Sequence, residues 1–241
     1  MKKLLPILFF AFGLLSQSFA QSDKDYKDLL TLFVSEKYEK CLYKAEGYTL
    51  KDETKKDPMP YMFVSRCYFE MSKRDEFKEK YPDAFKNAMK FISKYGQKDK
   101  ERKYAAEYED FFSDLRLAAM LEAEAMMDAQ KYTKAKTLYD QISDMDPNDA
   151  GAFLMLGVAQ HLMKAKKESE LSIKTARTIL TEKKASQAKE QLNLMRDAIT
   201  RYATILNDAG NKTSAKEWLD LGMEYLKDDK EYKVTYDMIA G

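Results

Sequence analysis

The stretch "YTKAKTLYDQISDMDPND", residues 132–149, decides the fold. Its apolar residues recur every three or four positions, which predicts an amphipathic helix in its first part. Asp146-Pro147 ends that helix, because proline disfavours α geometry in the residue before it. Asn148 or Asp149 can then cap a second helix by accepting a hydrogen bond from its free N–H groups. The stretch therefore predicts one helix, a tight turn and the start of another helix.

The whole chain repeats this pattern of short helices. Its 241 residues include only 8 glycines and 5 prolines, and no window shows the sustained alternation of a strand. Breaks in the periodicity predict helices over residues 24–35, 37–47, 59–71, 82–95, 99–112, 114–129, 131–144, 148–163, 168–181, 184–208, 211–227 and 229–239. Short helices with short connections are typical of stacked antiparallel pairs. The sequence therefore predicts an all-α fold, an α-solenoid of stacked antiparallel helix pairs.

A repeat of roughly 34 residues fits this arrangement best around the opening stretch. Residues 116–149 resemble one tetratricopeptide repeat (TPR), a helix–turn–helix unit with characteristic small, aromatic and proline positions. The matching residues are Ala123, Ala135, Tyr139 and Pro147, with Ile142 in place of an alanine. A unit at 150–183 keeps Phe153, Leu156, Gly157 and Ala176, and a unit near 196–229 keeps Ala203, Ala215 and Leu219. The resemblance implies a TPR-like solenoid.

The repeat pattern divides the chain into parts of different regularity. Residues 114–241 are expected to form a TPR-like array that ends in a capping helix. Residues 21–113 resemble degenerate helical repeats and form the N-terminal part. Within them, residues 71–113 fit worst, because their spacing is wrong for one standard unit. An extra or a longer helix pair is expected there.

Residues 1–20 have the pattern of a cleaved signal peptide. Two lysines precede an apolar core from Leu4 to Leu15, and "SQSFA" supplies small residues before Gln21. A helix of this core would rise only about 18 Å, which is short of the roughly 30 Å hydrocarbon core of a bilayer. We therefore expect an exported chain, in the periplasm of a Gram-negative bacterium or secreted. No transmembrane segment is expected after cleavage.

Charge and motifs argue against several classes of function. The 41 basic and 40 acidic residues are interspersed, so no basic surface for nucleic acid is expected. His161 is the only histidine, and the sequence lacks the motifs of phosphate-binding loops and serine hydrolases. "DMDPND" carries acids at alternate positions, but Asp149 and Met155 stand where a calcium-binding EF-hand loop needs glycine and glutamate. We expect a non-catalytic protein without cofactor or metal.

The resemblance also implies a binding surface, because the first helices of successive TPR units line the inner face of the array. The residues at the corresponding positions are Leu117, Met120, Glu124, Met127, Leu154, Val158 and His161. The third unit places Asp197, Thr200, Thr204 and Asn207 there. A largely apolar, methionine-rich face suits a hydrophobic helix or an extended segment of a partner. Two arrangements stay open: a partner fills this groove, or the chain covers it with residues 71–113 or with its last helix.

These features favour a protein–protein interaction scaffold of the cell envelope, peripherally associated with an envelope assembly. The alternative is a binder of an envelope ligand, such as a glycan or a peptidoglycan fragment. Residues 71–113, with their tyrosines, are the candidate region for that ligand. Cys41 and Cys67 would enter an oxidising compartment, where they either form a disulfide or stay as buried thiols.

Overall fold

Helices make up the regular structure of the described part of the chain. The computed structural model describes residues 26–182 and 185–241, so the expected signal peptide lies outside it. The helices are α1 (Lys27–Val34), α2 (Tyr38–Leu50), α3 (Met59–Ser72), α4 (Asp75–Lys78), α5 (Ala84–Lys98), α6 (Glu109–Asp128), α7 (Tyr132–Met145), α8 (Ala150–Leu162), α9 (Lys166–Thr181), α10 (Lys189–Asp208), α11 (Lys212–Leu226) and α12 (Lys230–Ala240). No strand is present in the two described ranges, and the all-α prediction is confirmed. None of the helices found there is both long and apolar enough to cross a bilayer.

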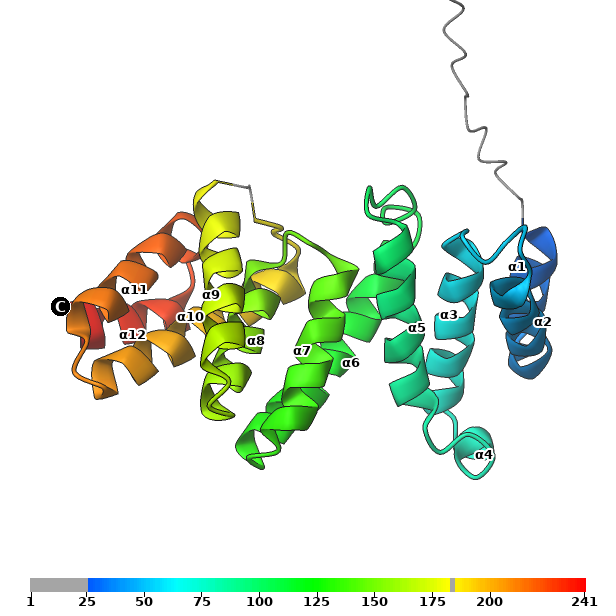
Figure 1. Cartoon of the computed structure of the whole chain (residues 1–241), viewed down its shortest axis with the longest axis horizontal. Coiled ribbons are helices and arrows are strands. Elements are labelled where there is room, and N and C mark those ends of the chain that lie inside the picture. Colours follow the sequence, from blue (N-terminus) through cyan, green and yellow to red (C-terminus); the bar gives the residue numbers. More distant parts are fainter. Residues whose placement is uncertain (1–25, 183–184) are drawn as a thin grey trace, which may run out of the picture.

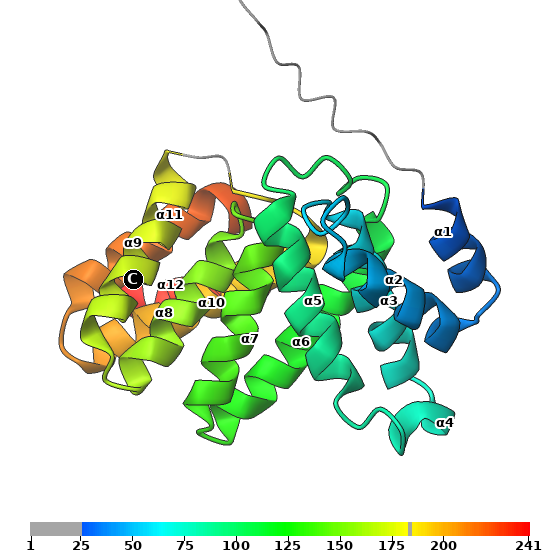
Figure 2. The same ribbon diagram turned by 45° about the vertical axis from the view of Figure 1, so that its right-hand side comes forward.

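The helices stack as successive pairs along the long axis of the molecule (Figures 1 and 2). α1 packs against α2, α3 against α5, α6 against α7, α8 against α9, and α10 against α11. α12 ends the row by packing against both α11 and α10. In Figure 1, α7 and α9 lie in front of α6 and α8, so these two pairs each give one helix to each of two layers. This arrangement is the predicted α-solenoid.

The turn between α7 and α8 follows the sequence prediction. α7 ends at Met145, and Asp146 takes an extended conformation before the proline. Asp149 is the N-cap of α8, and its carboxylate accepts a hydrogen bond from the backbone N–H of Ala152 at 3.0 Å. The predicted packing face of α7 is buried at Ala135, Tyr139 and Ile142. The predicted helix stop and restart are therefore confirmed.

Two connections in the N-terminal half differ from the predicted pattern. The helix predicted over 99–112 is wrong in its first part, because residues 99–108 form turns and α6 begins after them. The Asp99 carboxylate accepts hydrogen bonds from the backbone N–H groups of Lys103 (2.9 Å) and Tyr104 (3.3 Å), which hold a turn in place of a helix. The connection between α3 and α5 contains the short α4, which the sequence did not reveal. α3 and α5 still pack as one pair.

α8 is the most enclosed helix of the array. Between Ala150 and Gln160, every residue except Phe153 is buried. α7, α9 and α10 all pack against it. Gly151 permits the close approach of α10, since a Cβ at this position would lie 2.6 Å from the backbone nitrogen of Met195. α10 therefore covers part of the α8 surface that the TPR resemblance assigned to a partner.

Candidate binding groove

A groove opens between α6, α10 and α12, with a volume of about 390 Å³. Its walls come from α6 and α10, the first helices of their pairs, and from the capping helix α12. The lining residues are Glu124 of α6, Thr235 of α12, and Asp197, Thr200, Arg201, Thr204 and Ile205 of α10. We call this feature the inner groove. Its surface is polar and carries two carboxylates against one guanidinium.

The threonines of α10 give the inner groove hydrogen-bond acceptors. Thr200 Oγ1 donates to the backbone oxygen of Arg196 at 2.9 Å, and Thr204 Oγ1 donates to that of Thr200 at 2.9 Å. Each hydroxyl hydrogen is thus used within the helix, and the remaining lone pairs can accept. The groove therefore suits a ligand that donates hydrogen bonds.

Arg201 links α10 to α6 across the inner groove. Its Nη2 lies 3.7 Å from Glu124 Oε1 and 3.9 Å from Asp128 Oδ1. Both separations exceed hydrogen-bond length, and the Asp128 side chain is 71% exposed. Because water screens such pairs, they contribute little to stability and leave the carboxylates open to other donors.

Arg196 joins Asp197, which lines the inner groove, to the start of α12. Its Nε lies 2.9 Å from Asp197 Oδ1, and its Nη1 lies 3.4 Å from Asp229 Oδ2 and 3.1 Å from Glu231 Oε2. Burial disfavours the charge of Arg196, but the hydrogen bond and the three neighbouring carboxylates raise its pKa overall. Asp197 of the groove wall is therefore paired with an arginine that two further carboxylates hold in place.

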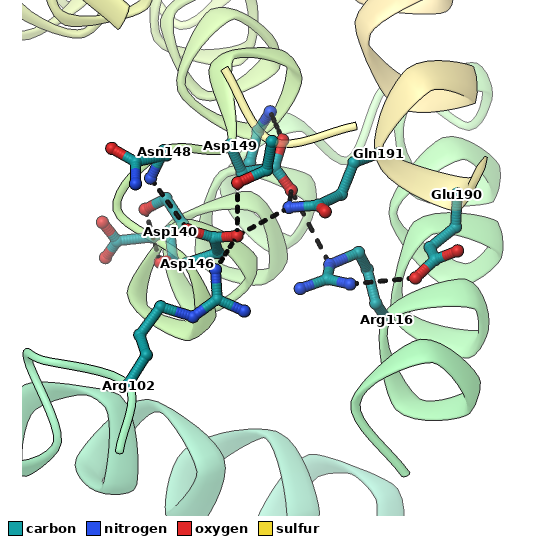
Figure 3. Close-up of polar contacts among 11 residues, drawn as sticks. Arg102, Arg116, Asp140, Asp146, Asn148, Asp149, Glu190 and Gln191 are labelled. Carbon is teal, nitrogen blue, oxygen red and sulfur yellow. Dashed lines mark hydrogen bonds and ion pairs between the residues drawn. The ribbon is translucent and has the colours of Figure 1, made fainter. Parts of the chain in front are cut away.

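A second polar cluster lies at the turn between α7 and α8 (Figure 3). Asp146 forms an ion pair with Arg102 and accepts hydrogen bonds from Ser186 Oγ (2.7 Å), Gln191 Nε2 (2.9 Å) and the backbone N–H of Asn148 (2.9 Å). Burial alone would raise the pKa of Asp146. These donors and the arginine outweigh burial and hold that pKa below its usual range. Asp146 therefore links the α7–α8 turn to the α5–α6 connection through Arg102 and to the α9–α10 connection through Ser186.

Asp149 is, like Asp146, an almost fully buried carboxylate of this cluster. Besides capping α8, it faces Arg116 Nε at 3.7 Å, and Arg116 Nη1 lies 3.1 Å from Glu190 Oε1 (Figure 3). Burial raises the pKa of Asp149 to about 6, although the charge of Arg116 and the bond from Ala152 N–H oppose the shift. The charge of Asp146 raises it further.

The polar cluster at the α7–α8 turn has a structural role. A cavity of about 180 Å³ adjoins it, lined in part by Arg102, Arg116 and Glu190. Glu190, one of the two carboxylates that line it, pairs with Arg116. Asp146 is engaged with Arg102 and Gln191, two other residues of the lining. Among residues 26–182 and 185–241, no three His, Cys, Asp or Glu side chains gather as a metal site would require. The cluster therefore joins α6, α8 and α10, and we do not assign it a ligand.

The seven residues predicted to line a binding surface differ in their exposure to solvent. Leu117, Glu124 and His161 are exposed and Met120 is half-buried, whereas Met127, Leu154 and Val158 are buried. Leu154 and Val158 lie on the same face of α8 as Gly151, which meets α10. The cover over this face thus comes from α10, whereas the sequence had offered residues 71–113 or the last helix for it. Of the seven, Glu124 alone appears among the lining residues of the inner groove.

The third repeat unit gave the better guide to the inner groove. Three of the four residues that its pattern placed on the inner face, Asp197, Thr200 and Thr204, line the groove, and Asn207 does not. Arg201 and Thr235 were missed, because Arg201 lies outside the inner-face positions of the repeat pattern, and Thr235 belongs to the capping helix. The exposed Leu121 was missed too, although it stands one helical turn after Leu117.

The region proposed for a glycan presents no open aromatic platform. Tyr81 donates a hydrogen bond to Glu39 and meets Tyr68 edge to face. Tyr95 is buried, and Tyr104 and Tyr108 are half-buried against the core. The tyrosines of 71–113 therefore serve packing.

The two cysteines lie in adjacent helices of the N-terminal part. Both sulfurs are buried with no exposed surface, in one apolar cluster that α2 and α3 share with α1. Cys41 Sγ donates to the backbone oxygen of Leu29 at 3.4 Å. A disulfide between Cys41 and Cys67 stays a prediction.

Comparison with known proteins adds two distant structural similarities. No family model and no curated protein matches the chain. The complex of the TPR2AB domain of yeast Sti1 with pHSP90 aligns with 91% of this chain and 87% of its own at 14% identity and a TM-score of 0.34. The C-terminal part of a TPR repeat-containing protein from Cytophaga hutchinsonii aligns with 88% and 99% of the two chains at 13% identity and a TM-score of 0.32. At such TM-scores neither similarity adds to what the helix packing shows, which is an all-α solenoid of paired helices.

Proposed function

We propose that this protein is a non-catalytic interaction scaffold of the cell envelope that holds a partner protein by a segment bound at the inner groove. The supporting observation is the groove itself, an open hollow of about 390 Å³ between α6, α10 and α12. It offers acceptors and carboxylates on helices that are fixed by packing on both sides. A preformed surface of this kind binds a segment with little ordering cost on its own side.

A site-specific cross-link tests this function. A photo-reactive residue placed at Thr204, which is exposed in the groove, should capture a discrete partner in the cells that make the protein. The matched control places the same residue at Leu171, which is 67% exposed on α9 in the other layer. Capture of the same proteins from both positions, or of none from Thr204, would contradict the proposal.

Residence in the envelope rests on the first twenty residues. We propose that export removes them and that the partner belongs to an envelope assembly, on which the protein sits peripherally. Cell fractionation and N-terminal sequencing test this part separately. A mature chain that begins at Gln21 supports it, and a chain that keeps Met1 in the cytoplasm contradicts it.

A further inference from the structure

α6 presents one continuous exposed stripe beside the inner groove. Six residues spaced three or four apart form it, and each one is exposed: Asp110, Asp114, Leu117, Leu121, Glu124 and Asp128. This spacing places them on a single face of the helix. We call this face the α6 stripe. Two leucines occupy its centre, and two carboxylates flank them at each end.

The α6 stripe has no basic residue of its own. α6 contains six acidic residues and one base, Arg116, in a chain whose net charge is only +1. Arg116 is buried and directed to Glu190 and Asp149, so it does not offset the stripe. In the described part of the chain, Asp110 and Asp114 have no ion-pair partner, and the other two acids meet only Arg201 beyond hydrogen-bond distance. Charge of one sign is thus concentrated on this face.

The centre of the α6 stripe is apolar and open to water. Leu117 is 48% exposed and Leu121 is 62% exposed, on adjacent turns. Covering these exposed leucines with an apolar surface is favourable, because it removes their side chains from water. Glu124 belongs both to the stripe and to the wall of the inner groove, so the two surfaces are continuous.

From this pattern we infer that the partner segment is a basic amphipathic helix, whose apolar residues cover Leu117 and Leu121 and whose Lys or Arg residues meet the acidic ends of the α6 stripe. The inference rests on the proposed function, because it names the chemistry of the segment held at that surface. The stripe spans about 27 Å, which corresponds to roughly 18 residues of partner helix. Basic residues are therefore required at both ends of the segment and apolar residues between them.

Defined peptides test this chemistry with the full mature chain. The probe is a helical peptide of about 18 residues with lysines at both ends and leucines in the centre. One matched peptide replaces the lysines with glutamates, and another replaces the leucines with glutamines. Fluorescence anisotropy should show at least about tenfold tighter binding of the first peptide than of either other, with affinity falling as salt rises.

Matched protein variants locate the binding face. Leu121→Gln and Asp114→Lys should each weaken binding of the basic peptide by about tenfold. Leu171→Gln and Glu170→Lys, at exposed positions on α9, should leave it unchanged. Equal loss from the α9 pair, or equal binding of the glutamate peptide, would overturn the inference. So would a dimer that Leu121→Gln abolishes in sedimentation, because a second copy would then cover the stripe.

The two proposals fail in different ways. If Thr204 captures a partner and neither α6 variant nor salt changes that capture, the proposed function stands and the basic helix is wrong. If Thr204 captures nothing and no peptide binds, both are wrong.

Discussion

Arg116 Nη1 lies 3.1 Å from Glu190 Oε1, and this ion pair joins α6 to α10 although 74 positions separate the two residues in the chain. The Arg116 side chain is only 3% exposed, so the pair is largely shielded from water. Its Nε faces Asp149 Oδ2 at 3.7 Å on the other side. One guanidinium thus compensates two carboxylates at the point where α6, α8 and α10 meet.

Removing this guanidinium should weaken the fold. We expect Arg116→Met to lower the free energy of unfolding by about 3–5 kcal/mol, because Asp149 would stay buried without a compensating charge. Adding Asp149→Asn should restore part of the loss, since asparagine caps a helix equally well and carries no charge. Urea unfolding of both single variants and of the double variant gives the coupling energy. Losses that simply add would contradict this account.

The Asp149 carboxyl should make stability depend on pH in one direction. Its pKa is raised to about 6 in the folded chain, so the folded state holds this proton more tightly than the unfolded state does. Its contribution to stability is fully present below the unfolded pKa near 4 and is lost as pH rises through about 6. Asp149→Asn has no carboxyl group to titrate, so the variant does not lose stability over this pH interval. The variant's stability relative to the natural chain should rise by up to about 1.4 kcal/mol per pH unit between pH 4 and 6, and then level off.

Asp146 is a useful comparison for that measurement, because its pKa is shifted in the opposite direction. Its pKa is lowered, so its contribution is present above the unfolded pKa and is lost only as pH falls below about 4. Asp146→Asn should therefore change the pH dependence mainly in the acid range. Because the charge of Asp146 also raises the pKa of Asp149, the same variant should move the Asp149 transition to lower pH. Chemical unfolding followed by circular dichroism at several pH values measures both. A flat difference for Asp149→Asn across pH 4–7 would contradict the assignment.

The sequence predicted the parts of the fold that depend on local pattern. The helix over 131–144 and the cap at Asp149 follow from periodicity and from the residue types at a helix end, and both are found. The helix expected over 99–112 failed in its first part, because the Asp99 side chain competes for backbone N–H groups. Periodicity cannot detect such a bond, since an aspartate at that position also suits a helix start.

The binding surface was harder to predict, because it depends on contacts between distant helices. Val158 has the residue type and position of an inner-face residue, yet the approach of α10 at Gly151 buries the face of α8 that carries it. The partner of that glycine, Met195, is far away in sequence, and no local pattern indicates the contact. On α6 the exposed face includes the predicted Leu117 and Glu124, but it presents Leu121 in place of the predicted Met120.

The close approach at Gly151 can be tested by adding one methyl group. Gly151→Ala should destabilise the protein by about 1–3 kcal/mol, because the new Cβ would meet the backbone of Leu194 and Met195, which cannot move aside like a side chain. Gly47→Ala is the matched control within α2, where no atom lies within 4 Å of the added carbon. It should stabilise by up to about 1 kcal/mol through helix propensity. Thermal unfolding measures both, and effects of the same sign would contradict the predicted clash.

The thiols of Cys41 and Cys67 should be protected in the folded chain. Neither has exposed surface. Hydrogen bonding with Cys67 lowers the pKa of Cys41 although burial opposes it, and the same bond together with burial raises the pKa of Cys67. Because access and thiolate formation both govern thiol reactivity, iodoacetamide at pH 8 should modify neither residue in the native protein. Mass spectrometry after labelling in denaturant without reductant then reads the redox state, with two modified cysteines for free thiols and none for a disulfide. Native labelling at the rate of the unfolded chain would show that the α2–α3 interface opens far more readily than its packing indicates.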